Sequence, residues 1–90
     1  MPQPHIVIYT TASCPYCHRA KALLNERGLA FEEISVDGDP AARATMTARA
    51  NGLYTVPQIF FGDRHIGGCD DLHDLDARGE LQTVLADAAQ

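Results

Sequence analysis

The sequence lacks any long apolar run. A helix that crosses a bilayer needs about 20 consecutive apolar residues, and the apolar stretches here are far shorter. The opening residues, MPQPH, also lack the basic and apolar segments of a signal peptide. We therefore expect a cytoplasmic protein with no membrane partner, in a compartment that keeps thiols reduced.

Basic residues are also scarce. Seven lysines and arginines face 12 acidic residues, for a formal net charge of −5. Nucleic-acid binding needs a basic face, so we expect no nucleic-acid partner. The charge is unevenly distributed, with a balance of +2 over residues 14–27 and −4 over residues 68–80. This layout suits a small zwitterionic ligand, but solvated helix faces give the same pattern.

Cysteines are few and odd in number: Cys14, Cys17 and Cys69. An odd number in a reducing compartment argues against a framework of structural disulfides. Two of the cysteines form the motif Cys14-Pro15-Tyr16-Cys17, which is typical of a redox pair or of half a zinc site. A zinc site would need Cys69 and a histidine as further ligands, and no second pair has the spacing of a zinc finger. We expect no metal.

Strand and helix signals alternate along the chain and predict an α/β fold. A chain of 90 residues has room for one core, so we expect a single domain over residues 1–90. Strands are predicted at residues 5–10, 29–36, 57–61 and 64–66, and helices at 15–27, 41–50 and 72–85, the last broken near Arg78-Gly79. Asp39 is expected to cap the second helix, with Pro40 at its first position. The first two strands, joined by a helix, should be parallel with a right-handed crossover. Pro57 must begin its strand, because proline cannot donate to a ladder.

Cys14 falls at the N-cap of the first predicted helix, and Pro15 suits the first helical position. The unpaired N–H groups and the positive end of the helix dipole favour thiolate over thiol there. Cys17, one turn further on, lies beneath Cys14 and can attack a mixed disulfide that Cys14 forms. The spacing therefore predicts thiol–disulfide exchange, with Cys14 as nucleophile and Cys17 as resolving thiol.

The segment CPYCH at residues 14–18 resembles the dithiol active site of the glutaredoxins. Two more segments match that family at its spacing, TVP at residues 55–57 and GGCDD at residues 67–71. The resemblance covers essentially the whole chain and is greatest to the short bacterial members. Tryptophan is absent, so the Trp-Cys-Gly-Pro-Cys pattern of thioredoxins is not present. The resemblance implies a thioredoxin fold, with a four-stranded mixed sheet flanked by helices and Pro57 in cis.

The resemblance also implies a glutathione-dependent thiol–disulfide oxidoreductase that reduces glutathione mixed disulfides and protein disulfides. Its partners would be glutathione, as co-substrate, and glutathionylated or disulfide-containing proteins, and we expect a monomer. The glutathione-binding residues that it implies are Tyr16, Thr55, Val56, Pro57, Gly68, Cys69, Asp70 and Asp71.

Roles for these residues follow from the same resemblance. The backbone of Val56 would pair with the cysteine of glutathione like an added strand. The N–H groups of Cys69 and Asp70 would receive a carboxylate, and Asp71, with Asp70 as second candidate, the γ-glutamyl ammonium. From the residues alone, both aspartates simply cap a helix, and the Cys69 thiol is a small buried hydrophobe.

Two alternative functions stay open at this point: an electron donor reduced directly by a flavoprotein reductase, and an iron–sulfur carrier with Cys14 and glutathione as ligands. The sequence departs from many relatives where Thr11 and Leu53 replace a Lys and an Arg associated with the glycine carboxylate of glutathione. Arg49 is the cation expected to substitute for them. Three histidines are expected at the surface: His18, His65 and His73.

Overall fold

The computed structural model describes residues 4–89. Its elements are β1 (Ile6–Thr10), α1 (Pro15–Glu26), β2 (Glu32–Ser35), α2 (Pro40–Arg49), β3 (Gln58–Phe61), β4 (Arg64–Gly67), α3 (Cys69–Ala77) and α4 (Leu81–Ala88). The strands of this part of the chain form a four-stranded sheet in the order β2-β1-β3-β4. β1 is parallel to β2, whereas β3 is antiparallel to β1 and β4. The predicted α/β fold with a mixed sheet is confirmed.

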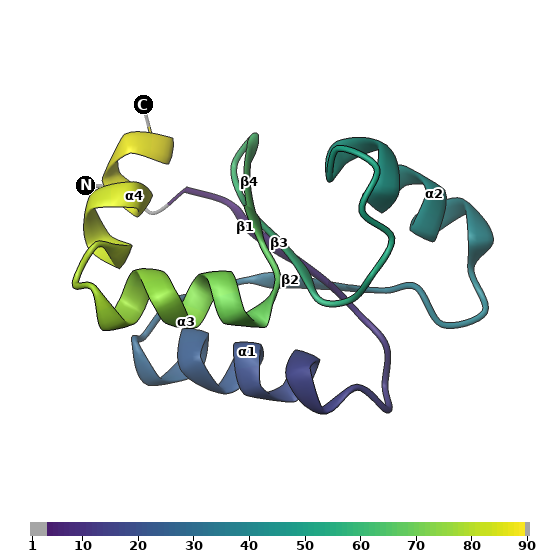
Figure 1. Cartoon of the computed structure of the whole chain (residues 1–90), viewed down its shortest axis with the longest axis horizontal. Coiled ribbons are helices and arrows are strands. Elements are labelled where there is room, and N and C mark those ends of the chain that lie inside the picture. The colour runs from purple at the N-terminus through teal and green to yellow at the C-terminus, as the bar shows by residue number, and fades with distance from the viewer. Residues whose placement is uncertain (1–3, 90) are drawn as a thin grey trace.

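Helices cover both faces of the sheet, and the residues of β1 are all buried for that reason. α1 and α3 lie together on one face and α2 lies on the other (Figure 1). Because strand side chains alternate between faces, Ile6 and Ile8 pack in the cluster shared with α1, α3 and α4. Val7 and Tyr9 pack in the cluster with Met46 of α2. The sheet is therefore the middle layer of three.

Two helices begin as the sequence predicts. Cys14 is the N-cap of α1, with Pro15 at its first position. Asp39 caps α2, where its Oδ1 accepts a hydrogen bond of 3.0 Å from the Ala42 N–H. Both caps satisfy N–H groups that a helix start leaves unpaired.

The second strand is shorter than predicted. It begins at Glu32, the partner of Val7 in β1, and not at residue 29. The Leu29 N–H still donates to Leu24 O at 3.0 Å, so the chain is completing the turn after α1 at that point. Leu29 and Phe31 pack against the core cluster below α1 instead of pairing in the sheet.

The closing helical segment consists of α3 and α4, separated near Arg78-Gly79 as predicted. α3 begins at Cys69, three residues before the predicted start. Gly67 has φ of +121°, a conformation that side chains rarely adopt. A Cβ there would collide with the carboxylate of Asp71. The glycine therefore lets α3 start close behind β4 and next to Pro57, whose carbonyl oxygen is near Gly68.

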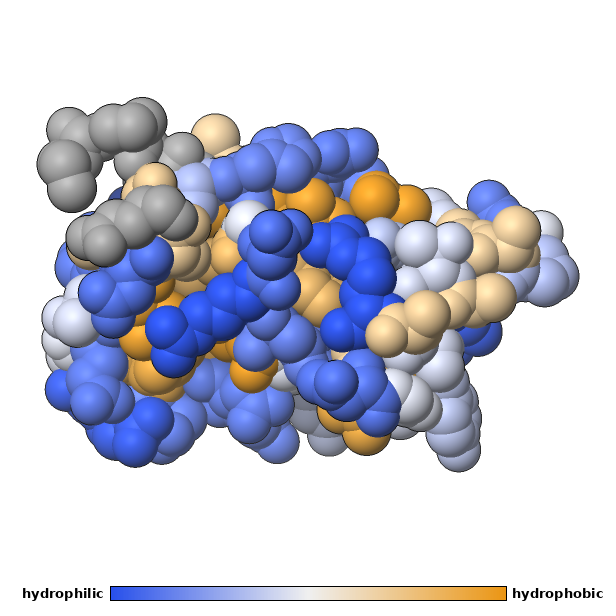
Figure 2. Space-filling model, turned by 90° about the horizontal axis from the view of Figure 1, so that it is seen from above, coloured by the Kyte–Doolittle hydropathy of each residue, from blue (hydrophilic) through white to orange (hydrophobic). Residues whose placement is uncertain are grey.

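Hydrophilic side chains dominate the face seen from above, with apolar atoms visible between them in separate patches (Figure 2). None of the helices in residues 4–89 combines the length and the apolar character needed to cross a membrane.

Candidate active site

The Cys14 sulfur lies at the positive end of α1. Its Sγ accepts a hydrogen bond of 3.3 Å from the Cys17 N–H in the first helical turn. No acidic residue occupies that turn. Backbone N–H groups aimed at a sulfur stabilise the thiolate more than the thiol. The half-buried Cys14 is therefore placed to react as a nucleophile.

Cys17 has the opposite environment. It has no exposed surface and belongs to the buried side of α1. Burial, reinforced by the side-chain hydrogen bond with Cys14, raises the pKa of Cys17 to about 12. At neutral pH the motif therefore holds one accessible sulfur and one buried, protonated thiol.

The segment before β3 lies next to the reactive sulfur. The Val56–Pro57 peptide bond is cis, as the resemblance implies, and Pro57 immediately precedes β3. The Cys14 thiol is 3.8 Å from Val56 O, within reach of a weak S–H donor. This contact brings the second motif to the first across 42 positions of sequence.

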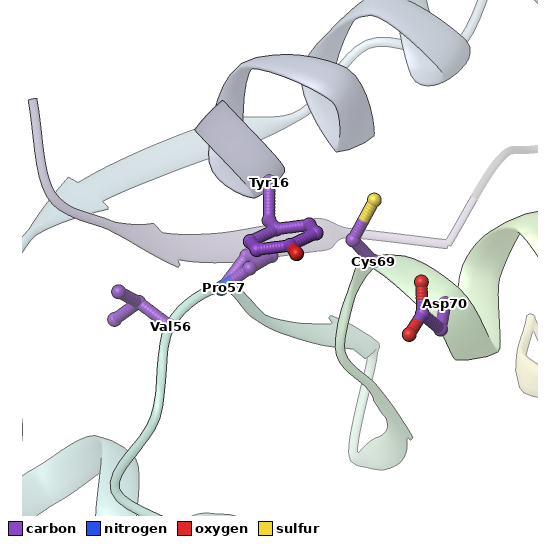
Figure 3. A pocket seen from close by; sticks show the side chains of 5 residues that line it. All are labelled: Tyr16, Val56, Pro57, Cys69 and Asp70. Carbon is purple, nitrogen blue, oxygen red and sulfur yellow. The ribbon is translucent and has the colours of Figure 1, made fainter. Parts of the chain in front are cut away.

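A shallow pocket extends from this contact and is lined by Tyr16, Val56, Pro57, Cys69 and Asp70. Figure 3 shows the Tyr16 ring projecting from α1 over Pro57, with Val56 to one side and Cys69 and Asp70 to the other. The volume of about 160 Å³ is below the ~300 Å³ of pockets that enclose a whole ligand. A ligand here would lie across the surface with only part of it inside.

The two aspartates at the start of α3 are placed differently. Asp71 turns back, and its Oδ2 accepts a hydrogen bond of 2.9 Å from the Gly68 N–H. Asp70 is exposed and lines the pocket. The structure thus shows the capping role for Asp71 that the residues alone suggest, and brings Asp70, the second candidate, beside Tyr16 and Cys69.

Cys69 packs in the core cluster between α1 and α3. Burial raises the pKa of the Cys69 thiol, and the charge of Arg19 offsets this only in part. A protonated, buried thiol is unreactive, in agreement with the prediction that Cys69 is a small buried hydrophobe.

Two cations of α1 form ion pairs with acidic residues of other elements. Arg27 of α1 donates to both carboxylate oxygens of Asp76 in α3, each at 2.7 Å. Lys21 pairs with Glu33 of β2 at 2.9 Å. Part of the uneven charge therefore forms ion pairs between elements of the fold, and these side chains are not available to a ligand.

The expectation for Arg49 is wrong. Its guanidinium lies 4.3 Å from the centre of the Phe60 ring and donates to the Tyr9 hydroxyl at 3.2 Å. These contacts hold it on the α2 face of the sheet, where Tyr9 and Phe60 belong to the core cluster. It cannot replace the cations missing at Thr11 and Leu53.

Sequence reasoning missed two residues beside the site, Gln58 and His65. Gln58 is buried, and its amide nitrogen donates to Thr55 O at 3.1 Å. His65 is half-buried against it, contrary to the expectation of a surface position, with Nε2 2.6 Å from Gln58 Oε1. A polar residue within the otherwise apolar stretch at residues 58–61 is the signal that could have drawn attention to this pair.

Among residues 4–89, no three His, Cys, Asp or Glu side chains lie together in a way that could hold a metal ion.

Thr55, the remaining residue predicted to bind glutathione, is exposed. Its carbonyl and hydroxyl oxygens both accept from Gln58, and it does not line the pocket.

Comparison with known proteins agrees with this geometry. The model of the family "Glutaredoxin" matches residues 6–66. A glutaredoxin of Pseudomonas aeruginosa is 55% identical over 83 residues, which cover 92% of this chain and 98% of that protein. The chain belongs to the glutaredoxin family. Glutaredoxin 3 of Escherichia coli K12 is similarly related, at 56% identity over 90% of this chain and 96% of its own length.

Solved glutaredoxins also share the fold. The solution structure from Brucella melitensis aligns with a TM-score of 0.80 at 48% identity and covers 92% of this chain and 89% of that one. A complex of buckwheat glutaredoxin with glutathione aligns with a TM-score of 0.81 at 31% identity, covering 97% and 80%. These matches confirm the thioredoxin fold and the thiol–disulfide oxidoreductase activity, and favour neither alternative function.

Proposed function

We propose that Cys14 is the nucleophile with which this glutaredoxin reduces glutathione mixed disulfides and protein disulfides at the expense of glutathione. The observation that carries this assignment is the Cys17 N–H donating to Cys14 Sγ at the start of α1, beside Val56. This one sulfur combines a backbone N–H donor aimed at it, partial exposure and an adjacent segment that can hold a ligand.

The first step is exchange of one disulfide for another. The Cys14 thiolate attacks the glutathione sulfur of a mixed disulfide, forms a new S–S bond to it and expels the substrate sulfur as thiolate, which takes up a proton. A second glutathione thiolate then attacks the glutathione sulfur bound to Cys14. This releases glutathione disulfide and restores the Cys14 thiolate. One free glutathione is oxidised for each mixed disulfide reduced, and the other half of the glutathione disulfide comes from the substrate.

Cys17 serves substrates whose disulfide joins two cysteines of one protein. Cys14 forms a mixed disulfide with the first of them, and Cys17 loses its proton and attacks Cys14. The substrate leaves as a dithiol, and Cys14 and Cys17 form a disulfide that two glutathione molecules reduce. The high pKa of Cys17 supports this order, because a protonated thiol does not compete with Cys14 for the first attack.

Glutathione is assigned to the pocket beside Cys14. Val56 offers its backbone to the cysteine of glutathione, in the manner of an added strand. Tyr16, Thr55, Pro57, Gly68 and Cys69 frame the site. We assign the γ-glutamyl ammonium to the aspartates at the start of α3. Asp70 is placed first because it lines the pocket, and Asp71, which is exposed but accepts from the Gly68 N–H through Oδ2, is the second candidate. The complex of the buckwheat relative with glutathione supports glutathione as the ligand.

The wider setting of the activity is also a proposal. The whole chain, residues 1–90, acts as a single glutaredoxin domain and as a monomer in the cytoplasm, where it transfers electrons from glutathione to glutathionylated or disulfide-containing proteins. Sedimentation at micromolar concentrations would check the monomer.

A coupled assay tests the proposed function. The protein is mixed with glutathione, glutathione reductase, NADPH and a glutathionylated peptide, and NADPH oxidation is followed. We expect turnover that depends on glutathione. Turnover that persists when a flavoprotein thioredoxin reductase replaces glutathione and its reductase would instead support the electron-donor alternative.

A further inference from the structure

We propose that Gln58 is a positioning residue, whose side-chain amide fixes the Thr55–Val56 peptide group so that the Val56 N–H faces the bound ligand. The inference rests on the proposed function, in which the Val56 backbone pairs with the cysteine of the substrate. It assigns a role in substrate binding to a side chain that does not line the pocket.

Gln58 is buried at the start of β3, with 2% of its surface exposed. Its amide nitrogen donates to two oxygens of Thr55, the carbonyl at 3.1 Å and the hydroxyl at 3.3 Å. A buried amide without partners would destabilise the fold, so these bonds and the one to His65 keep the side chain in this orientation.

The hydrogen-bond partners of Gln58 also determine the positions of the nitrogen and the oxygen of its side-chain amide. Thr55 O is a carbonyl and can only accept, so the amide nitrogen of Gln58 must face it. Gln58 Oε1 is then the acceptor, and His65 Nε2, at 2.6 Å, must carry the proton. A proton added to the other ring nitrogen of His65 leaves this bond in place.

His65 is itself held from the neighbouring strand. It stands opposite Phe60 in the β3–β4 pairing, and the two rings are 5.0 Å apart at an angle of 32°. Arg49 packs against the Phe60 ring and Tyr9 meets it edge to face. The amide of Gln58 is thus anchored to the core cluster beneath α2.

The Thr55–Val56 peptide group connects the Gln58 amide to the ligand site, because fixing its C=O also fixes its N–H. The Thr55–Val56 bond is trans, because the cis bond of this segment is Val56–Pro57. In a trans peptide the C=O and N–H point in opposite directions. With Thr55 O directed inward to Gln58, the Val56 N–H points outward, and within residues 4–89 it has no hydrogen-bond acceptor.

A second side chain holds this segment without orienting that N–H. Arg43 of α2 donates to Tyr54 O at 2.6 Å. The N–H in the Tyr54–Thr55 peptide group belongs to Thr55, not to Val56. Arg43→Met therefore removes a side-chain hydrogen bond to the carbonyl of the adjacent peptide group, and it provides a matched control for Gln58→Met.

The experiment compares two disulfides in single-turnover reactions with the Cys17→Ser protein, in which the mixed disulfide on Cys14 accumulates. One is a glutathionylated peptide, which has backbone groups that can pair with Val56. The other is bis(2-hydroxyethyl) disulfide, which has none. Acid-quenched samples are analysed by mass spectrometry, and second-order rate constants are obtained for the background, Gln58→Met and Arg43→Met.

We expect Gln58→Met to lower the rate constant for the glutathionylated peptide about fivefold, the effect of losing one neutral hydrogen bond, and to leave the rate for bis(2-hydroxyethyl) disulfide unchanged. Arg43→Met should leave both rates unchanged. His65→Phe keeps a ring against Phe60 but removes the donor to Gln58, and should slow the peptide reaction about twofold. It also serves as the test variant if Gln58→Met does not fold.

Equal slowing with both disulfides would show that Gln58 supports the fold or Cys14 in general and would overturn the inference. So would unchanged rates with both disulfides in a folded Gln58→Met protein. Failure of the proposed function has a different signature, since the Cys17→Ser background itself would then form no mixed disulfide with glutathione on Cys14.

Discussion

The two sulfurs of the motif differ in burial and in their hydrogen-bond partners, although only two residues separate them. Cys14 caps α1 and is half-buried, whereas Cys17 is fully buried one turn later. The N–H that stabilises the Cys14 sulfur belongs to Cys17. This bond comes from the backbone, so a substitution of the Cys17 side chain keeps it and separates the resolving role from the stabilising one.

The buried thiol makes stability depend on alkaline pH. The pKa of Cys17 rises from 9.0 to about 12 on folding, chiefly through burial, so the folded state holds this proton more tightly than the unfolded chain. Its contribution to stability is complete below about pH 9 and is lost as the pH rises toward 12. Under reducing conditions, the melting temperature of Cys17→Ala should fall less between about pH 9 and pH 11 than that of the wild type.

Thermal denaturation followed by circular dichroism measures this difference. The Cys14→Ala variant is the control, because it keeps the buried thiol and should show most of the wild-type decline, reduced only by the smaller part of the Cys17 pKa shift that Cys14 causes. Parallel declines of wild type and Cys17→Ala would contradict the assignment of the alkaline loss to Cys17.

At the scale of elements, the start of α3 divides its two aspartates between fold and site. Gly67 turns the chain so that Asp71 folds back onto the Gly68 N–H. Asp70, one position earlier, is carried to the other side of the turn and into the pocket lining. The division follows from the helical rotation between neighbouring residues.

A pair of alanine variants separates the two roles. Asp71→Ala should reduce the free energy of unfolding by about 1 kcal/mol, because it removes a cap at a helix start, with little change in KM. Asp70→Ala should raise KM for a glutathionylated peptide about twofold to fivefold, as expected for a partly exposed charge pair, and leave the melting temperature unchanged.

Denaturant titration and steady-state kinetics on the same preparations give both quantities. If Asp71→Ala raised KM and left stability intact, the assignment of the ammonium would return to Asp71.

Elements with a local signal were predictable from the sequence. The pairs Cys14-Pro15 and Asp39-Pro40 determine where α1 and α2 begin, since each places a capping side chain before a proline that suits the first helical position. The second strand was predicted too long because Leu29 and Phe31 pack against the core cluster outside the ladder between β1 and β2. A pattern of apolar residues does not distinguish these two forms of burial.

The part of the site that lies within the three sequence motifs could be predicted. The spacing of Cys14 and Cys17 predicted their roles, and the family resemblance added the cis proline and the GGCDD segment. The contact of Gln58 with His65 depends on the β3–β4 register, which shifts between Ile59 and Phe60. Such a register is a property of the folded sheet, and no spacing in the sequence encodes it directly. The same holds for Arg49, whose partners Tyr9 and Phe60 lie on two other strands.

At the scale of the whole molecule, the net charge of −5 leaves few cations for an anionic tripeptide. The single lysine, Lys21, is paired with Glu33, and Arg27 is paired with Asp76. The family resemblance places Thr11 where many relatives carry a lysine, and the Thr11 carbonyl accepts the Cys14 N–H at 3.4 Å. A cation at position 11 would therefore stand beside the reactive sulfur.

Thr11→Lys should raise the rate of Cys14 alkylation by iodoacetamide at mildly acidic pH, because an ammonium nearby stabilises the thiolate. We expect a gain of about twofold to fivefold at low salt and a smaller gain at high salt, where the charge is screened. KM for a glutathionylated peptide should fall in parallel. Thr11→Gln is the uncharged control, and identical rates for the Lys and Gln variants would show that position 11 does not face the thiolate.

The central claim is that Cys14 is the nucleophile and that Cys17 only resolves. The most direct measurement is the glutathione-coupled turnover of a glutathionylated peptide by wild type, Cys14→Ser and Cys17→Ser, since serine supplies no thiolate. We expect background turnover for Cys14→Ser and substantial turnover for Cys17→Ser, which should fail only with an intramolecular protein disulfide. Turnover by Cys14→Ser above about a tenth of wild type would contradict it, because that much activity requires another nucleophile.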